Sequence, residues 1–273
     1  MFRRNQPWLG TYVEISIRDD IDSDMAHNAI DAAFGAIAQV HRLMSFHESA
    51  SDLARINAMA FEEEITVHPW TYQVLMTAKD LYARTNGIFD CTIAPYLQRQ
   101  GLLPGNFQVD VTASMNDVRL NPYNRVRYDK RLCLDLGGIA KGFAVDRAID
   151  ALEQHGISLA VVNAGGDMRV LGQYPEEVYI RDPHDPKRMI HAGELSDGAI
   201  ATSGIYFSKN LSIDRNASAL VNPLQRESVM AANSFSVLAS TCMLADGLTK
   251  VLAVGRNPTA TYFTEFKAQV IIL

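Results

Sequence analysis

The stretch LDLGGIAKGFAVD at residues 134–146 places two adjacent glycines between an apolar run and a segment with helical periodicity. This order predicts a strand, a tight turn and a helix that continues to His155 and ends at Gly156. Glycines let the backbone of such a turn approach a ligand, and the free N–H groups at a helix start favour an anion. Lys141 adds a positive charge, so the element suits phosphate groups. The alternative is an ordinary strand-to-helix turn with an exposed lysine, because the spacing matches neither the GxGxxG fingerprint nor the P-loop.

Helical and strand-like patterns alternate irregularly on both sides of this element. Apolar residues recur at helical spacing from Ala26 to Met44, with Ser23 as the expected N-cap. Further helices are expected at 51–57, 71–84 and 243–251, strands at 11–17, 159–163, 169–171, 178–181, 199–202, 211–213, 219–221, 235–239 and 270–273, and hairpins between 107 and 135. The mixture predicts an α+β (mixed α/β) fold with a largely antiparallel sheet packed by helices. Since no repeat or Gly/Ser linker divides the chain, residues 1–273 are interpreted as one domain.

The composition limits the possible functions. Of 273 residues, 48% are hydrophobic and 21% are charged, which is typical of a globular protein with a large core. The net charge of −6 argues against a nucleic-acid partner, because binding a polyanion needs a surplus of Lys and Arg. No apolar run reaches the roughly 18 residues of a membrane span, and no signal-peptide pattern is present, so we expect a cytoplasmic protein. The three scattered cysteines fit reduced thiols better than disulfides or a zinc site.

Three further stretches contain candidate binding residues. Gly165 and Gly166 follow a buried strand and would let a flat ring or a ribose lie against the main chain; the alternative is a hairpin turn. Asp90 is suited to hydrogen-bond a ligand, although capping the next turn is the more common role. Asp246 offers a carboxylate to a hard cation, and Lys250 lies on the same helical face, so the alternative is an Asp–Lys pair within one helix.

The order of these motifs along the chain resembles the ApbE-like family. The motifs are WLGT at 8–11, MSF at 44–46, SDL at 51–53 with Asn57, GIFD at 87–90, residues 134–146, NAGGD at 163–167, ATSG at 201–204 and AD at 245–246. The resemblance covers about residues 7 to 265 and implies a T-fold-type layered architecture. It also implies FAD:protein FMN transferase activity, in which FAD is split with Mg²⁺, FMN is joined through a phosphoester to a threonine of an acceptor flavoprotein, and AMP is released.

The same resemblance implies roles for individual residues. The FAD site would contain Met44, Ser45, Asp90, Asp135, Lys141, Gly165, Gly166, Thr202 and Ser203, with Lys141 at the pyrophosphate. Magnesium would contact the carbonyl of Gly138 and the carboxylate of Asp246. Phosphoryl transfer of this kind depends mainly on positioning and on cationic charge.

Two positions depart from the family pattern. Four residues after its metal-binding aspartate the family has a metal-binding threonine, where this chain has Lys250. The family also has a histidine, thought to activate the acceptor threonine, in a HxxDP-type segment; the matching stretch here is ALVNP at 219–223, which begins with Ala219. Alanine cannot take a proton, and such a base typically contributes about 10²–10⁴-fold. Asp214, His47 or the acceptor itself would then have to serve as the base.

Three functions therefore stay open: an FMN transferase, a catalytically silent FAD-binding protein, and a Mg²⁺-dependent FAD pyrophosphatase that makes FMN and AMP. The two departures also suggest a linked hypothesis. The ammonium group of Lys250 would occupy the magnesium position and neutralise both Asp246 and the FAD phosphates without a metal.

Overall fold

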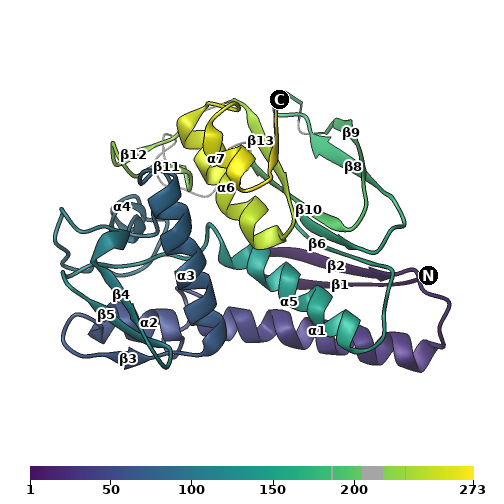
Figure 1. The fold of residues 1–273 in the computed structure, drawn as a ribbon, viewed down its shortest axis with the longest axis horizontal. Coiled ribbons are helices and arrows are strands. Elements are labelled where there is room, and N and C mark those ends of the chain that lie inside the picture. The colour runs from purple at the N-terminus through teal and green to yellow at the C-terminus, as the bar shows by residue number, and fades with distance from the viewer. Residues whose placement is uncertain (186, 205–217, 231) are drawn as a thin grey trace.

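An antiparallel sheet of seven strands forms the centre of the computed structural model (Figure 1). The structure describes residues 1–185, 187–204, 218–230 and 232–273. In spatial order the strands are β1 (Phe2–Trp8), β2 (Thr11–Ile17), β6 (Ala160–Ala164), β7 (Asp167–Leu171), β10 (Gly198–Gly204), β13 (Ser234–Ala239) and β14 (Gln269–Ile272). Every pairing between described strands is antiparallel, which confirms the predicted α+β class and sheet type.

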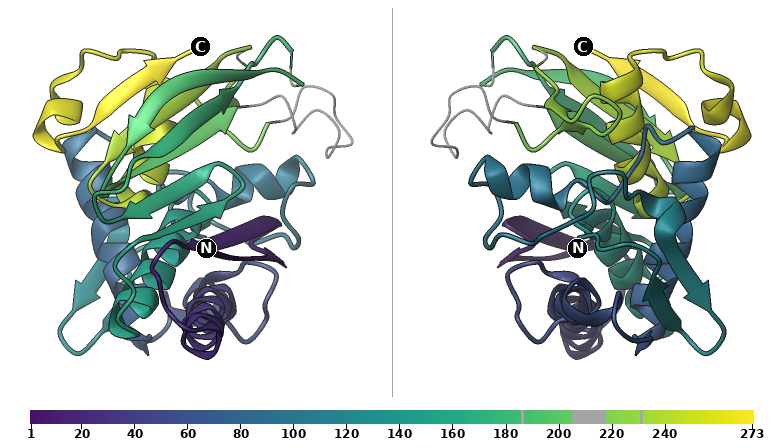
Figure 2. Two further views of the ribbon diagram at one scale, coloured as in Figure 1. Left: turned by 90° about the vertical axis from the view of Figure 1, so that its right-hand side faces the viewer. Right: turned by 90° about the vertical axis from the view of Figure 1, so that its left-hand side faces the viewer.

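Three helices cover one face of this sheet. They are α1 (Ser23–Met44), α5 (Ala140–Gln154) and α6 (Cys242–Gly255). Alternation along β6 separates the two faces, since Val162 belongs to the core shared with these helices, whereas Val161 packs on the opposite side. Figure 2 shows α1 end-on, below the strands. All three helices therefore lie on the same face of the central sheet.

A hairpin covers the opposite face of the sheet. It consists of β8 (Glu176–Arg181) and β9 (Met189–Leu195), which pair with each other. Val178 and Ile180 of β8 form a second, smaller core with Val161, Val170 and Ile200 of the main sheet. The central strands are thus buried on both faces, which explains why β6 is a nearly continuous apolar run and does not alternate with polar residues.

A smaller layer follows the C-terminal end of α1, at the left of Figure 1. Its elements are α2 (Asp52–Met59), β3 (Ile65–Thr66), α3 (Pro69–Arg84), α4 (Ala94–Arg99), the 3-10 turn η1 (Met115–Asp117), β4 (Val118–Asn121) and β5 (Arg125–Tyr128). The three strands form a sheet in the order β3-β5-β4. The remaining elements are β11 (Val221–Asn222), β12 (Glu227–Ser228) and α7 (Thr261–Glu265).

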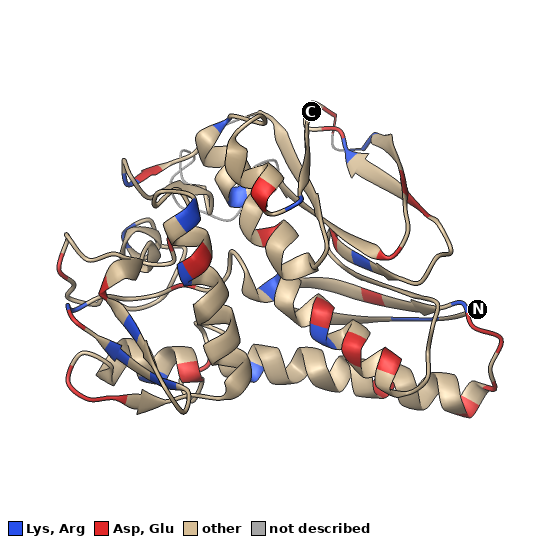
Figure 3. Cartoon of the chain, in the orientation of Figure 1, with Lys and Arg blue, Asp and Glu red and all other residues tan. Residues whose placement is uncertain are grey.

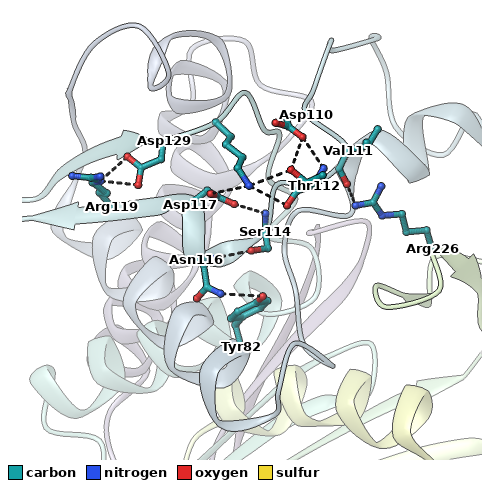
Figure 4. A network of polar contacts seen from close by, with 11 residues as sticks. Tyr82, Asp110, Val111, Thr112, Ser114, Asn116, Asp117, Arg119, Asp129 and Arg226 are labelled. Carbon is teal, nitrogen blue, oxygen red and sulfur yellow. Dashed lines mark hydrogen bonds and ion pairs between the residues drawn. The ribbon is translucent and has the colours of Figure 1, made fainter.

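Polar contacts fix the loop before β4 (Figure 4). Asp110 Oδ1 accepts hydrogen bonds from the backbone N–H and the hydroxyl of Thr112, both at 2.7 Å. Arg226, in the turn between β11 and β12, donates to the carbonyl of Val111. This contact ties the hairpin that follows Ala219 to the smaller layer.

Most predicted helices and strands are confirmed, but two local predictions are wrong. The N-cap of α1 is Asp22, which accepts a hydrogen bond from the N–H of Met25, and Ser23 is already helical. Leu134 lies in no strand, because the amide of Asn57 replaces a strand partner: it donates to the Leu134 carbonyl (2.9 Å) and accepts from the Leu134 N–H (2.8 Å). Six elements were not predicted from the sequence: β1, β3, β9, β12, α4 and α7.

Three further observations concern the predictions made for the whole chain. The strand expected at 211–213 and the candidate base Asp214 lie outside the described residues. None of the described helices is long and apolar enough to cross a membrane. Charged residues of both signs are interspersed over helices and loops (Figure 3).

Candidate functional site

A cavity of about 640 Å³ lies where the end of α1, the start of α5, the end of β10 and α6 meet. It brings together most of the residues that the resemblance assigns to FAD and magnesium: Met44, Ser45, Asp90, Asp135, Gly138, Lys141, Gly165, Thr202 and Ser203. Lys250, which departs from the family pattern, lines the same cavity. Ala219 and His47 also line it. Gly166 and Asp246 do not, because Gly166 is exposed on its turn and Asp246 is fully buried beside Lys250.

Lys141 stands in the first turn of α5 and forms an ion pair with Asp167 at the start of β7 (3.0 Å between Nζ and Oδ2). Burial, together with the nearby Asp246, raises the pKa of Asp167 to about 6. Burial by itself would lower the pKa of Lys141, but Asp167 and Asp246 outweigh it and raise that pKa. Lys141 therefore stays charged at the wall of the cavity, where an ammonium group suits a phosphate.

Asp246 points from α6 toward the start of α5 with both of its carboxylate oxygens engaged. Oδ2 accepts a hydrogen bond from the backbone N–H of Gly142 (3.0 Å), and Oδ1 pairs with the ammonium group of Lys250. The side chain of Asp246 is fully buried. The predicted Asp–Lys pair within one helix is confirmed, and it sits at the cavity.

A close crossing of α5 and α6 positions these groups. A Cβ on Gly142 would lie 2.2 Å from the carbonyl oxygen of Cys242, so only glycine fits at this contact. Asp146, one turn further along α5, accepts hydrogen bonds from the N–H groups of Cys242 and Met243, each at 2.9 Å. These bonds cap the N-terminus of α6. The role of Asp146 could not be predicted from the sequence, because its partners lie 96 and 97 residues away and no local pattern indicates them.

The turn Gly165-Gly166 is a two-residue hairpin loop between β6 and β7, as the hairpin interpretation predicts. Gly165 has a φ of +61°, and a Cβ there would lie 2.4 Å from the hydroxyl of Thr11. Glycine is therefore required both by the backbone conformation and by the neighbouring strand. Gly165 and the neighbouring Thr11 both line the cavity.

Two more carboxylates face the cavity. Asp90 Oδ1 accepts from the N–H and the hydroxyl of Thr92, both at 2.7 Å, so the expected role of capping the next turn is confirmed. Burial nevertheless raises the pKa of Asp90. Burial also raises the pKa of Asp135, although the N–H of Gly137, which donates to its Oδ1 (3.1 Å), opposes the shift. The cavity thus combines lysines with carboxylates that take up a proton more readily than usual.

The remaining wall is apolar, and sequence reasoning missed it. Its side chains come from several elements: Leu9, Val40, Phe46, Ile88, Ile93, Leu97, Leu102 and Leu103. No single periodicity connects these residues, because they come from α1, from α4 and its N-cap, and from separate loops. Together with the lysines, they form a cavity that is apolar on one side and cationic on the other.

A second cavity, of about 560 Å³, adjoins the first. The two share Asp90, Ile93, Val221 and Pro223 in their walls. Arg226, which holds the loop before β4, lines only the second cavity. The hairpin after Ala219 therefore stands between the two spaces.

The described residues do not fit a magnesium ion at Asp246. In residues 1–185, 187–204, 218–230 and 232–273, no group of three or more His, Cys, Asp or Glu side chains is placed to hold a metal. Both oxygens of Asp246 already have partners, and one of these partners, Lys250, is itself a cation. A divalent ion would have to compete with this ammonium group for the carboxylate.

Fold and cavity together define a layered α+β protein with a partly cationic, partly apolar ligand cavity where its helices meet the end of its sheet. The sequence model of the ApbE family matches residues 9–272, and the chain belongs to this family. Similar solved structures include the flavin transferase ApbE from Vibrio cholerae, with a TM-score of 0.81, 26% identity, and coverage of 99% of this chain and 92% of that one. The ApbE protein from Thermotoga maritima has a TM-score of 0.84, 25% identity, and coverage of 99% and 93%.

Curated relatives are named FAD:protein FMN transferase. Those from Rhodobacter capsulatus and Vibrio cholerae are each 29% identical to this chain, over 90% and 91% of its length. The chain spans 50% of the Rhodobacter relative and 79% of the Vibrio relative.

Proposed function

We propose that this protein binds FAD in the 640 Å³ cavity and transfers the FMN half to a hydroxyl group of an acceptor protein, with release of AMP. The proposal rests on one observation. A single cavity is lined by two lysines, Lys141 and Lys250, on one side and by apolar side chains on the other. FAD has the matching parts: two phosphates, and an isoalloxazine ring that is large and mostly apolar. Family membership and the names of the relatives support the same ligand.

In this proposal each lysine keeps donors for the ligand. An ammonium group has three N–H donors, and the ion pairs with Asp167 and Asp246 need only one each. Lys141 would contact the pyrophosphate, while Met44 and the apolar wall would hold the ring. Asp90, Asp135, Thr202 and Ser203 supply polar groups around it. The turn Gly165-Gly166 would let the ligand lie against main chain.

The reaction joins the acceptor oxygen to the phosphorus on the riboflavin side and breaks the bond from that phosphorus to the bridging oxygen. AMP leaves with that oxygen, and the hydroxyl proton goes to a base. Ala219 cannot be this base, whereas His47, Asp90 and Asp135 line the same cavity. The adjoining 560 Å³ cavity gives the acceptor segment a route past the shared wall at Asp90. We assign no step to a metal.

The test incubates the purified protein with FAD, with and without a threonine-containing acceptor flavoprotein. AMP is measured by chromatography, and labelled acceptor by in-gel flavin fluorescence. We expect one AMP per labelled acceptor. Lys141→Gln, which removes the charge and keeps a hydrogen-bond donor, should lower the rate on the order of 10²-fold or more. Lys187→Gln, on the exposed loop between β8 and β9, is the matched control.

A second candidate function is storage or delivery of FAD without catalysis. Ala219 favours it, because the position lines the cavity but carries no proton acceptor. Bound FAD with neither AMP nor labelled acceptor would support this function. AMP without label would indicate an FAD pyrophosphatase, and a protein with no affinity for FAD would refute the flavin assignment altogether.

A further inference from the structure

We infer that Lys250 is a built-in cation that takes the place of a divalent metal, so that the cavity binds the phosphates of its ligand on two ammonium groups and needs no metal ion. The inference rests on the proposed function, because FAD is taken as the ligand. The inference concerns only how the negative charge of the FAD phosphates is neutralised. Three features of the structure support this inference.

The first feature is that the carboxylate of Asp246 has no free oxygen. Gly142 donates its backbone N–H to Oδ2 at 3.0 Å, and this N–H is fixed by the close crossing of α5 and α6. Lys250 pairs with Oδ1. Since Asp246 is fully buried, it cannot turn toward solvent to offer an oxygen to a metal. A cation that reached it would have to share an oxygen with the Gly142 N–H or with the Lys250 ammonium group.

The second feature is the path of the Lys250 side chain. A Cβ on Gly138 would lie 3.5 Å from Cε and 3.7 Å from Cγ of Lys250, so the stem of the lysine packs along this glycine. The lysine therefore bridges the space between α6 and the turn at residues 137–138, where the resemblance would place magnesium. Its side chain is 23% exposed, and it lines the cavity.

The third feature is the arrangement of charge around the two lysines. Lys141 pairs with Asp167, and Lys250 pairs with Asp246. Each buried carboxylate thus has its own ammonium partner, and each ammonium keeps donors for a phosphate. A divalent ion entering beside Lys250 would meet a like charge at short range, where the interior screens it poorly. The Lys250 ammonium group and a divalent ion would therefore compete for this carboxylate.

The test compares FAD affinity with and without metal. The purified protein is treated with EDTA, and FAD binding is followed by quenching of flavin fluorescence, first in EDTA and then with excess Mg²⁺. We expect the dissociation constant to agree within about twofold in the two conditions. Isothermal titration of Mn²⁺ into the FAD-loaded protein should show no binding at a stoichiometric site.

The matched variant is Lys250→Thr, which frees Oδ1 of Asp246 and places a hydroxyl oxygen one helical turn away. We expect its FAD affinity in EDTA to fall on the order of tenfold, to recover with Mg²⁺, and to be accompanied by stoichiometric Mn²⁺ binding. Lys187→Thr should behave like the unmodified protein. The EDTA comparison on the unmodified protein needs no variant, so it decides the question even if Lys250→Thr does not fold.

The outcomes separate this inference from the proposed function. If the unmodified protein binds FAD only when Mg²⁺ is present, the inference fails while the FAD assignment stands. Stoichiometric Mn²⁺ binding to the unmodified FAD-loaded protein would also overturn it. If the protein binds no FAD under either condition, the proposed function fails, and the inference fails with it.

Discussion

Two buried carboxylates each hold one lysine at the wall of the cavity. Asp167 is 1% exposed and Asp246 is 0% exposed, yet they belong to β7 and α6, which are far apart in the chain. The cost of burying these charges is partly offset by the lysines and, for Asp246, by a backbone N–H. At the scale of single residues, the site is therefore a set of ion pairs whose lysines line the cavity.

The raised pKa of Asp167 predicts a specific pH dependence of stability. Because its pKa is about 6 in the folded protein and 3.8 for the free side chain, the folded state takes up this proton first as the pH falls. The Asp167 contribution to the free energy of unfolding should therefore rise between about pH 6 and pH 4, by roughly 2–3 kcal/mol relative to Asp167→Asn. Urea unfolding across this range measures it, with exposed Asp20→Asn as the control. A difference between protein and variant that does not change with pH would contradict the assignment.

At the scale of elements, the crossing of α5 and α6 determines where Lys141, Asp246 and Lys250 stand. Gly142 lets the helices touch, and Asp146 caps the start of α6. Asp146 also accepts from Arg169 of β7 (2.8 Å), so the same carboxylate links α5, α6 and the sheet. The segment at Leu134, held by Asn57, then leads into α5 without any strand pairing.

Gly142→Ala tests this crossing. The added methyl group would lie 2.2 Å from the Cys242 carbonyl and 2.8 Å from Cβ of Asp246, so the helices would have to separate. We expect the free energy of unfolding to fall by about 1–3 kcal/mol. Gly35→Ala, on the exposed face of α1 with no atom within 4 Å of the new Cβ, should instead raise it by about 0.5–1 kcal/mol. Equal effects of the two substitutions in urea unfolding would rule out the close contact.

At the scale of the whole molecule, the cavity exists only because the central sheet, its helices and the smaller layer meet. Leu9 comes from the turn between β1 and β2, Leu97 from α4, and Lys250 from α6. The β8–β9 hairpin takes no part in the cavity and closes the other face of the sheet. Ligand binding should therefore stabilise the two layers together.

FAD should raise the stability of the whole molecule. At a free concentration 100 times its dissociation constant, it should add about 2.7 kcal/mol to the free energy of unfolding. Riboflavin and AMP can each make only part of the contacts proposed for FAD. At equal concentration, each should therefore raise the melting temperature less than FAD does. Thermal denaturation followed by tryptophan fluorescence measures this order. A shift with riboflavin as large as that with FAD would mean that Lys141 and Lys250 contribute nothing to binding.

The sequence by itself determined the features that neighbouring residues encode. Helical periodicity and caps place α2, α5 and α6, alternating or apolar runs place most strands of the central sheet, and the order of the motifs indicates the family. The pair Asp246–Lys250 also follows from spacing alone, since residues four apart share a helix face. These signals are local, so they can be read without a fold.

Only the tertiary structure decided which partners complete the site. The N–H of Gly142 takes the second oxygen of Asp246 across 104 residues of sequence, and Asn57 replaces a strand partner for Leu134 across 77. The apolar wall gathers side chains from elements with no common pattern. Burial and contacts between distant segments arise only when the layers pack. Spacing in the sequence predicts one partner of Asp246, Lys250, but packing supplies the other, so that both carboxylate oxygens have a partner.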